Sequence, residues 1–235
     1  MIPDDPDAHQ IRQEFLEYVK RFHEEHEFAS DWKMLCERLC VPVHAASSNQ
    51  YTRLKGNPII CYNADEPANR QIFTGLNELS HHLFATADAG FLALLRDKYE
   101  SKIAEAFEED FCNQAASLLL FPDHVVHKVI GEHGYSPESI FELTQRPASR
   151  AAALMRIIKS HSLEWWGLIM THDGCIEFSC TTSRYTLGKN HFIERGHRIH
   201  EAWSGTLEIA APLPYASGDR KVKKRCVQVR TAKEL

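Results

Sequence analysis

Phe73-Thr-Gly-Leu-Asn-Glu-Leu-Ser-His-His-Leu-Phe84 is the stretch on which the fold depends. Its apolar residues recur at spacings of three and four, which predicts a helix over about residues 70–86. Asn77 and His81 are four residues apart, so their side chains lie one turn apart on the same face. Glu78 lies at the edge of that face. The stretch therefore predicts a packed helix that carries a small polar cluster.

This polar cluster differs at one position from a motif that binds zinc. In H-E-x-x-H, two histidines on one helix face bind the metal, and the glutamate activates the bound water. Here the order is Asn77-Glu-Leu-Ser-His81, so an asparagine stands where the first histidine belongs. Zinc prefers imidazole, thiolate or carboxylate ligands to a neutral amide oxygen. The pattern predicts a zinc-peptidase type of helix with one ligand changed.

The composition is that of a globular protein, with 43% hydrophobic and 25% charged residues among 235. A net charge of -5 argues against broad electrostatic binding to nucleic acid, and we expect the basic run Arg220–Arg225 to be a solvated strand or loop. No apolar run approaches the ~20 residues that span a membrane. The acidic N-terminus lacks the features of a signal peptide, so we expect a cytoplasmic protein that binds no membrane. The seven cysteines form no C-x-x-C pair and are expected to be free thiols.

Apolar periodicity predicts an α+β protein that is mainly helical at first and rich in strands at its end. The expected helices cover about residues 8–27, 30–39, 70–86, 102–120, 136–145 and 150–159, with Ser30 as the N-cap of the second. The expected strands cover about residues 51–55, 58–62, 163–171, 175–181, 207–210 and 222–230. Turns are expected at Gly56-Asn57 and at His172-Asp-Gly174. We expect a first domain at 1–132, a segment resembling a helix-turn-helix at 133–162, and a β-rich domain at 163–235.

The helix expected over residues 102–120 has two different faces. Phe107, Phe111, Ala115 and Leu118 form an apolar stripe, and Pro122 ends the helix. Another face carries Glu105, Glu109, Cys112 and Ala116. Carboxylates on such a face are either solvated surface or, in a zinc peptidase, the source of the third metal ligand.

Three stretches taken together resemble the ImmA/IrrE family of zincin-like metallopeptidases. The first is Pro58–Asn63 followed by Arg70-Gln-Ile-Phe-Thr74, which resembles the family's strand and its entry into the metal-binding helix. The second is Asn77–Phe84 at the position of the motif. The third is Glu109–Pro122, which resembles the family's glutamate-bearing helix. The resemblance covers about residues 51–130, and the tail is weakly similar to longer members with a GAF-like domain.

This resemblance implies a zinc endopeptidase that acts on a repressor-type DNA-binding protein, in a setting of stress response and transcription regulation. It implies Glu78 as the general base, His81 as the second histidine ligand and Glu109 as the carboxylate ligand. Glu108 and Glu105 are alternative registers for that carboxylate. The implied metal is Zn²⁺, with Mn²⁺ as the other candidate.

Asn77 leaves more than one outcome open. The site holds a metal through the Asn77 oxygen or through a replacement ligand, for which Cys112 is the candidate because it lies one turn from Glu109. Alternatively, the chain is a degenerate peptidase that binds a repressor partner without cutting it. In a third outcome, the asparagine is an engineered change of the ligand. A separate function class is a DNA-binding protein that uses Arg150, Arg156 and the basic run. We expect the helices at 136–159 to form a packing pair and direct DNA binding to be absent.

Overall fold

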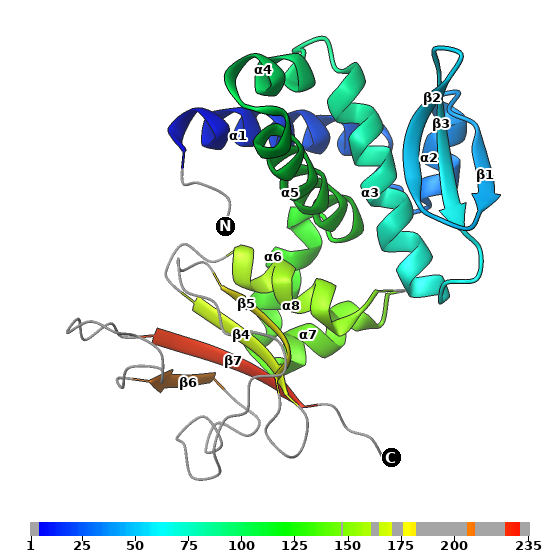
Figure 1. Cartoon of the computed structure of the whole chain (residues 1–235). Coiled ribbons are helices and arrows are strands. Elements are labelled where there is room, and N and C mark those ends of the chain that lie inside the picture. Colours follow the sequence, from blue (N-terminus) through cyan, green and yellow to red (C-terminus); the bar gives the residue numbers. More distant parts are fainter. Residues whose placement is uncertain are drawn as a thin grey trace. The chain divides into compact units, whose positions relative to one another are not determined.

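The computed structural model describes residues 5–146, 148–160, 165–170, 176–181, 206–209 and 224–230. It confirms an α+β chain that is mainly helical, with small sheets (Figure 1). The helices are α1 (Pro6–Glu25), α2 (Trp32–Arg38), α3 (Ala68–Thr86), α4 (Phe91–Lys98), α5 (Ser101–Leu120), α6 (Asp123–His133), α7 (Pro137–Thr144) and α8 (Arg150–Lys159). The strands are β1 (Val43–Ala46), β2 (Gln50–Leu54), β3 (Asn57–Asn63), β4 (Trp165–Met170), β5 (Ile176–Thr181), β6 (Thr206–Ile209) and β7 (Lys224–Arg230).

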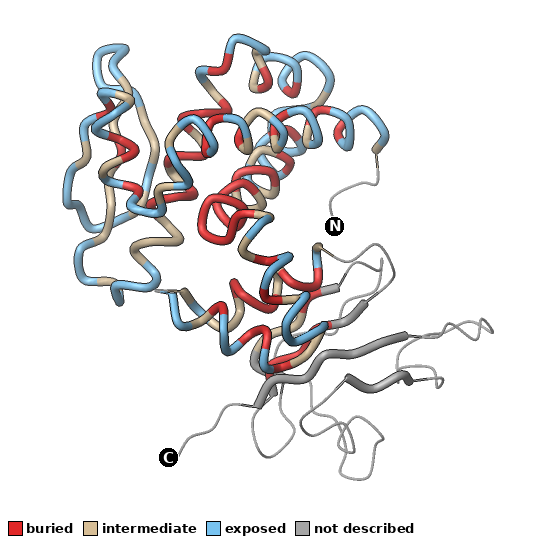
Figure 2. The backbone as a smooth tube through the Cα atoms, turned by 180° about the vertical axis from the view of Figure 1, so that it is seen from behind, coloured by how far each residue is buried: buried red, intermediate tan, exposed pale blue. Residues whose placement is uncertain are grey.

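The chain divides into two compact units, Met1–Asp123 and His124–Leu235. The core of the first unit is a cluster of aromatic rings between α1, α3, α4 and α5. Phe84 of α3 lies at its centre, with ring centroids 4.8 Å from Phe15, 5.7 Å from Phe91 and 6.3 Å from Phe111. Buried aromatic pairs at such distances add to the hydrophobic stabilisation. Figure 2 shows how burial is concentrated in the helices, whereas the strands of this unit are mostly half-buried or exposed. The helices therefore form a rigid support for the polar residues of α3 and α5.

A three-stranded sheet flanks α3, in the order β1-β3-β2. β1 runs parallel to β3, and β2 runs antiparallel to it, so β2 is an edge strand. Lys55 and Gly56 form the tight turn between β2 and β3, with φ of 51° and 87°. The turn thus lies one residue earlier than the expected Gly56-Asn57, because the paired register Leu54–Asn57 leaves Lys55 and Gly56 as the two loop residues.

The sheet-side end of α3 packs closely on α2. A Cβ atom on Gly75 would lie 2.3 Å from the Trp32 ring, so only glycine permits this approach. α2 begins later than expected: Asp31, and not Ser30, is its N-cap, because the Asp31 carboxylate accepts hydrogen bonds from the backbone N–H groups of Lys33 and Met34. This packing sets the position of the helix that carries Asn77 and His81.

The second unit contains a sheet in the order β5-β4-β7-β6, with β4 and β7 parallel. α8 packs on it through Leu154 and Ile158, and Gly167 of β4 leaves the space that these side chains need. α6 follows directly after Pro122, where no helix was expected, since proline ends α5 but is compatible with a new helix beginning after it. The GAF-like character of the C-terminal part stays a prediction.

Some expectations concern residues outside the described ranges. Residues 172–174 of the expected hairpin turn and residues 220–223 of the basic run lie outside them. Cys36, Cys40, Cys61 and Cys112 are free thiols, as expected. Within the described ranges, every helix is too short or too polar to cross a membrane.

Candidate functional site

The candidate site lies where α3 packs against α5, the most extensive helix pair in the described part of the chain. Its polar side chains come from adjacent turns of the two helices: Asn77, Glu78 and His81 from α3, and Glu108, Glu109, Cys112 and Asn113 from α5. The apolar stripes of both helices face the core, which leaves these side chains at the edge of the packed interface.

His81 is held by two carboxylates on α5. Its Nδ1 lies 2.9 Å from Glu108 Oε1, and its Nε2 lies 3.3 Å from Glu109 Oε2. Burial acts to lower the pKa of His81, but hydrogen bonds to Cys112, Glu108 and Glu109 outweigh it and hold that pKa well above its usual value. The Glu109 pKa is lowered, chiefly by its hydrogen bond from His81. His81 is therefore held between two carboxylates in a hydrogen-bonded network that favours its protonated form.

Asn77 takes part in this network as a hydrogen-bond donor. Asn113 Nδ2 donates to the Glu109 backbone oxygen at 2.9 Å and to Glu109 Oε1 at 2.8 Å. These two acceptors fix the orientation of the Asn113 amide, so its Oδ1 accepts the 2.8 Å bond from Asn77 Nδ2. Asn77 also hydrogen-bonds Glu109 directly, which lowers the Glu109 pKa further. The amide of Asn77 thus turns its N–H groups toward Glu109, the carboxylate that the family resemblance implies as a metal ligand.

Glu78 connects the site to the small sheet. Its Oε2 accepts a hydrogen bond of 2.5 Å from the backbone N–H of Tyr51 in β2. Burial raises the pKa of Glu78, while the charge of His81 and the Tyr51 bond oppose that rise. A half-buried carboxylate with a raised pKa is suited to accepting and returning a proton.

The side chains present do not fit a three-ligand zinc centre. A catalytic zinc takes three protein ligands and a water. His81 Nε2 and Glu109 Oε2 are suitable ligands and converge, but Asn77 offers N–H groups on that side. Cys112 lies against His81, and burial raises the pKa of its thiol to about 11. Among the residues that the structure describes, no group of three or more His, Cys, Asp or Glu side chains is arranged to hold a metal ion.

The structure brings together most of the residues that the sequence singled out. Asn77, Glu78, His81, Glu109 and Cys112 all lie within this cluster. Glu108 is there as well, on the other ring nitrogen of His81. Glu105 lies outside this cluster, and its carboxylate accepts a hydrogen bond from Ser101 at the start of α5.

The sequence patterns did not predict two residues of the site, Asn113 and Tyr51. Asn113 lies four residues after Glu109, a spacing that places both on one face and could have indicated it. Tyr51 contributes a backbone group, which no residue pattern reveals.

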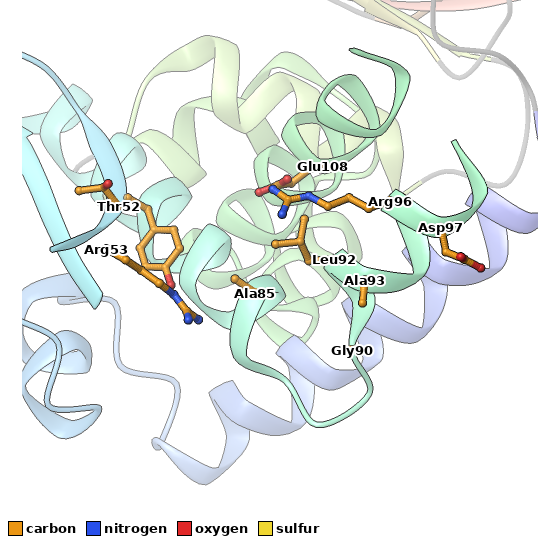
Figure 3. Close-up of a pocket in the computed structure, with 10 residues that line it drawn as sticks. Thr52, Arg53, Ala85, Gly90, Leu92, Ala93, Arg96, Asp97 and Glu108 are labelled. Carbon is orange, nitrogen blue, oxygen red and sulfur yellow. The ribbon is translucent and has the colours of Figure 1, made fainter. Parts of the chain in front are cut away.

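A cleft of about 880 Å³ adjoins the cluster (Figure 3). It is lined by β2, by the end of α3, by α4 and by Glu108, and so reaches the carboxylate that holds His81. A cavity of this size is within the usual range of ligand-binding sites in proteins.

Comparisons with known proteins agree with the resemblance. The profile of the IrrE N-terminal-like domain, a peptidase family, matches residues 36–156, which is more than half of this chain. The radiation response metalloprotease IrrE of Deinococcus radiodurans is 28% identical to this chain over 97 residues. That match covers 41% of this chain and 29% of the relative's length.

The fold is also similar to that of a solved structure, a transcriptional regulator from Mycobacterium tuberculosis. The TM-score is 0.51 at 9% sequence identity, and the likeness covers 77% of this chain and 62% of the other. At this identity the likeness concerns the fold alone.

Proposed function

Because the chain belongs to the IrrE N-terminal-like family of metallopeptidases, we propose that it uses the family's scaffold to bind a segment of a partner protein without cleaving it. The partner class is the repressor-type DNA-binding protein that the resemblance implies. Binding of a polypeptide requires a cleft, and one of about 880 Å³ adjoins the polar cluster. Hydrolysis requires in addition a metal bound by three protein ligands.

The observation that carries the proposal is the hydrogen-bond chain from Asn77 through Asn113 to Glu109. It directs the Asn77 amide N–H toward α5, and it gives the side chains of Asn113 and Glu109 hydrogen-bond partners. Buried polar groups that are fully hydrogen-bonded rigidify a site. The polar cluster thus forms its hydrogen bonds among its own side chains.

The second candidate is the activity of the family, metal-dependent endopeptidase action on the same class of partner. A specific observation favours it: Glu108 binds His81 Nδ1, as a carboxylate commonly does behind a metal-binding histidine, and this leaves Nε2 facing Glu109. Zn²⁺ is the metal that the family implies. Mn²⁺ is the alternative, since carboxylate and carbonyl oxygens suit it.

Metal analysis and a cleavage assay separate the two candidates. The purified chain is incubated with Zn²⁺ or Mn²⁺, dialysed and analysed for metal, and it is also co-expressed with a repressor-type protein encoded beside its gene. We expect less than stoichiometric metal, an intact repressor and a complex that co-purifies. Cleavage that stops in Glu78→Gln would establish the peptidase and overturn the proposal. An intact repressor that forms no complex would also contradict it.

A further inference from the structure

The cleft beside the site carries two arginines from different elements. Arg53 comes from β2 and Arg96 from α4. Figure 3 shows their side chains on the two sides of the cleft, with Ala85 and Leu92 between them. Both side chains are exposed, and neither forms an ion pair within the described part of the chain.

Neither of the two acidic residues that line the cleft forms an ion pair with these arginines. Glu108 is engaged by His81 at 2.9 Å. Asp97 lies beyond Arg96 and points away from both arginines in Figure 3. Arg53 and Arg96 therefore bring to the cleft two positive charges that have no ion-pair partner among the described residues, although the whole chain has a net charge of -5.

A third donor group lines the same cleft. The hydroxyl of Tyr51 is buried and has no hydrogen-bond partner. A buried hydroxyl without a partner costs free energy, which an oxygen acceptor from a ligand would recover. Two guanidinium groups and one hydroxyl favour a ligand that brings acceptor oxygens with negative charge.

The main chain of β2 indicates that this ligand is a peptide. Residues of an antiparallel strand alternate between facing the partner strand and facing the open edge. The N–H of Tyr51 goes to Glu78 and so faces away from β3. Arg53, two residues further, has the same orientation, so its backbone N–H and C=O face the open edge of β2 beside the cleft. An extended segment can pair with such an edge.

We propose that the cleft between β2 and α4 selects a peptide segment with an aspartate or glutamate side chain, which Arg53 and Arg96 bind from its two sides. This inference rests on the proposed peptide-binding function and adds the chemistry of the segment. Guanidinium groups bind carboxylates through paired, charge-assisted hydrogen bonds, which gives direction as well as attraction.

A phage library of random decapeptides, selected on the full chain, tests this inference. We expect aspartate or glutamate to be enriched at one or two positions, and this enrichment to disappear when the double variant Arg53→Gln/Arg96→Gln is the target. The double variant Lys102→Gln/Lys128→Gln is the matched control, because both lysines are exposed cations outside the cleft and their loss removes the same two charges.

The possible results distinguish this inference from the function on which it rests. Selected peptides without an acidic preference, or with one that the double variant retains, overturn the inference and leave peptide binding intact. The absence of any selected peptide overturns both.

The affinity of one selected peptide provides a second measurement. Arg53→Gln and Arg96→Gln should each weaken its binding about fivefold to tenfold, the range of a partly exposed charged hydrogen bond. Binding should also weaken as the salt concentration rises. An affinity equal to that of the wild type in both variants contradicts the assignment. Far-ultraviolet circular dichroism verifies that each variant is folded.

Discussion

At the scale of single residues, Asn77 decides what the polar cluster can hold. Replacing Asn77 by His supplies the ligand type that the family motif has at this position. We expect Asn77→His to gain stoichiometric zinc and a stabilisation of about 2.7 kcal/mol at a zinc concentration 100 times its Kd. Elemental analysis and the melting temperature with and without zinc measure this. Asn77→Gln is the control, and equal zinc binding by the wild type and Asn77→His would contradict the assignment.

The side chain of Asn113 is hydrogen-bonded to both Asn77 and Glu109, so its removal should lower the stability of the protein. Asn113→Ala leaves Asn77 and Glu109 without their connecting amide. We expect a loss of about 1–3 kcal/mol in the free energy of unfolding, since half-buried polar groups lose their partner. Gln114→Ala is the matched control, because its bond to Asp110 lies within one helix and contributes about 0.2–0.5 kcal/mol. Urea denaturation measures both variants, and equal losses would show that Asn113 has no special role.

His81 should make stability depend on pH in the metal-free protein. Its folded pKa is raised by Cys112, Glu108 and Glu109 against the effect of burial, so its ion pairs contribute fully below the unfolded pKa of ~6.5. Their contribution is lost as the pH rises from there through the folded pKa, with a slope of at most about 1.4 kcal/mol per pH unit. We expect the stability advantage of wild type over His81→Gln to shrink between pH 6 and pH 9 in the presence of a chelator. A constant or growing difference would contradict this protonation state.

At the scale of elements, the close approach of α2 and α3 orients the helix that carries the site. A Cβ atom at Gly75 would overlap the Trp32 ring, which is 3% exposed and has little room to move. We expect Gly75→Ala to lower the free energy of unfolding by about 1–3 kcal/mol, as overpacking does. A shifted tryptophan emission should accompany the loss.

Gly131→Ala is the control for that change. Gly131 lies in α6, and a Cβ atom there meets nothing within 4 Å. Alanine at such a position stabilises a helix by about 0.5–1 kcal/mol. If Gly75→Ala also raises the free energy of unfolding, the result contradicts the close packing of Trp32 against α3.

The elements also show what local patterns can predict. α3 and α5 follow from their apolar periodicity, and β2 and β3 from the glycine turn between them. The N-cap of α2 was placed one residue early, because Ser30 and Asp31 are both good N-caps and only the fold selects between them. α6 was missed because Pro122 indicates the end of a helix and says nothing of the next one.

At the scale of the whole molecule, the candidate site and its supporting core lie in the unit Met1–Asp123. The ring cluster of Phe15, Phe84, Phe91 and Phe111 is internal to this unit. We expect a fragment of residues 1–133, which keeps α6 complete, to show a helical circular dichroism spectrum and cooperative unfolding in urea. A broad, non-cooperative transition would show that the unit depends on the rest of the chain.

The sequence by itself determined the α+β class, the principal helices of the first unit and the membership in a metallopeptidase family. It also determined that Asn77, Glu78 and His81 share a region of one helix, because helical spacing is a local property. Only the tertiary structure decided that Asn77 is a donor to Asn113, that Glu108 holds His81 and that Arg53 faces the same cleft as Arg96. These relations join segments up to 43 residues apart in the chain, and such distances depend on how the helices and the sheet pack.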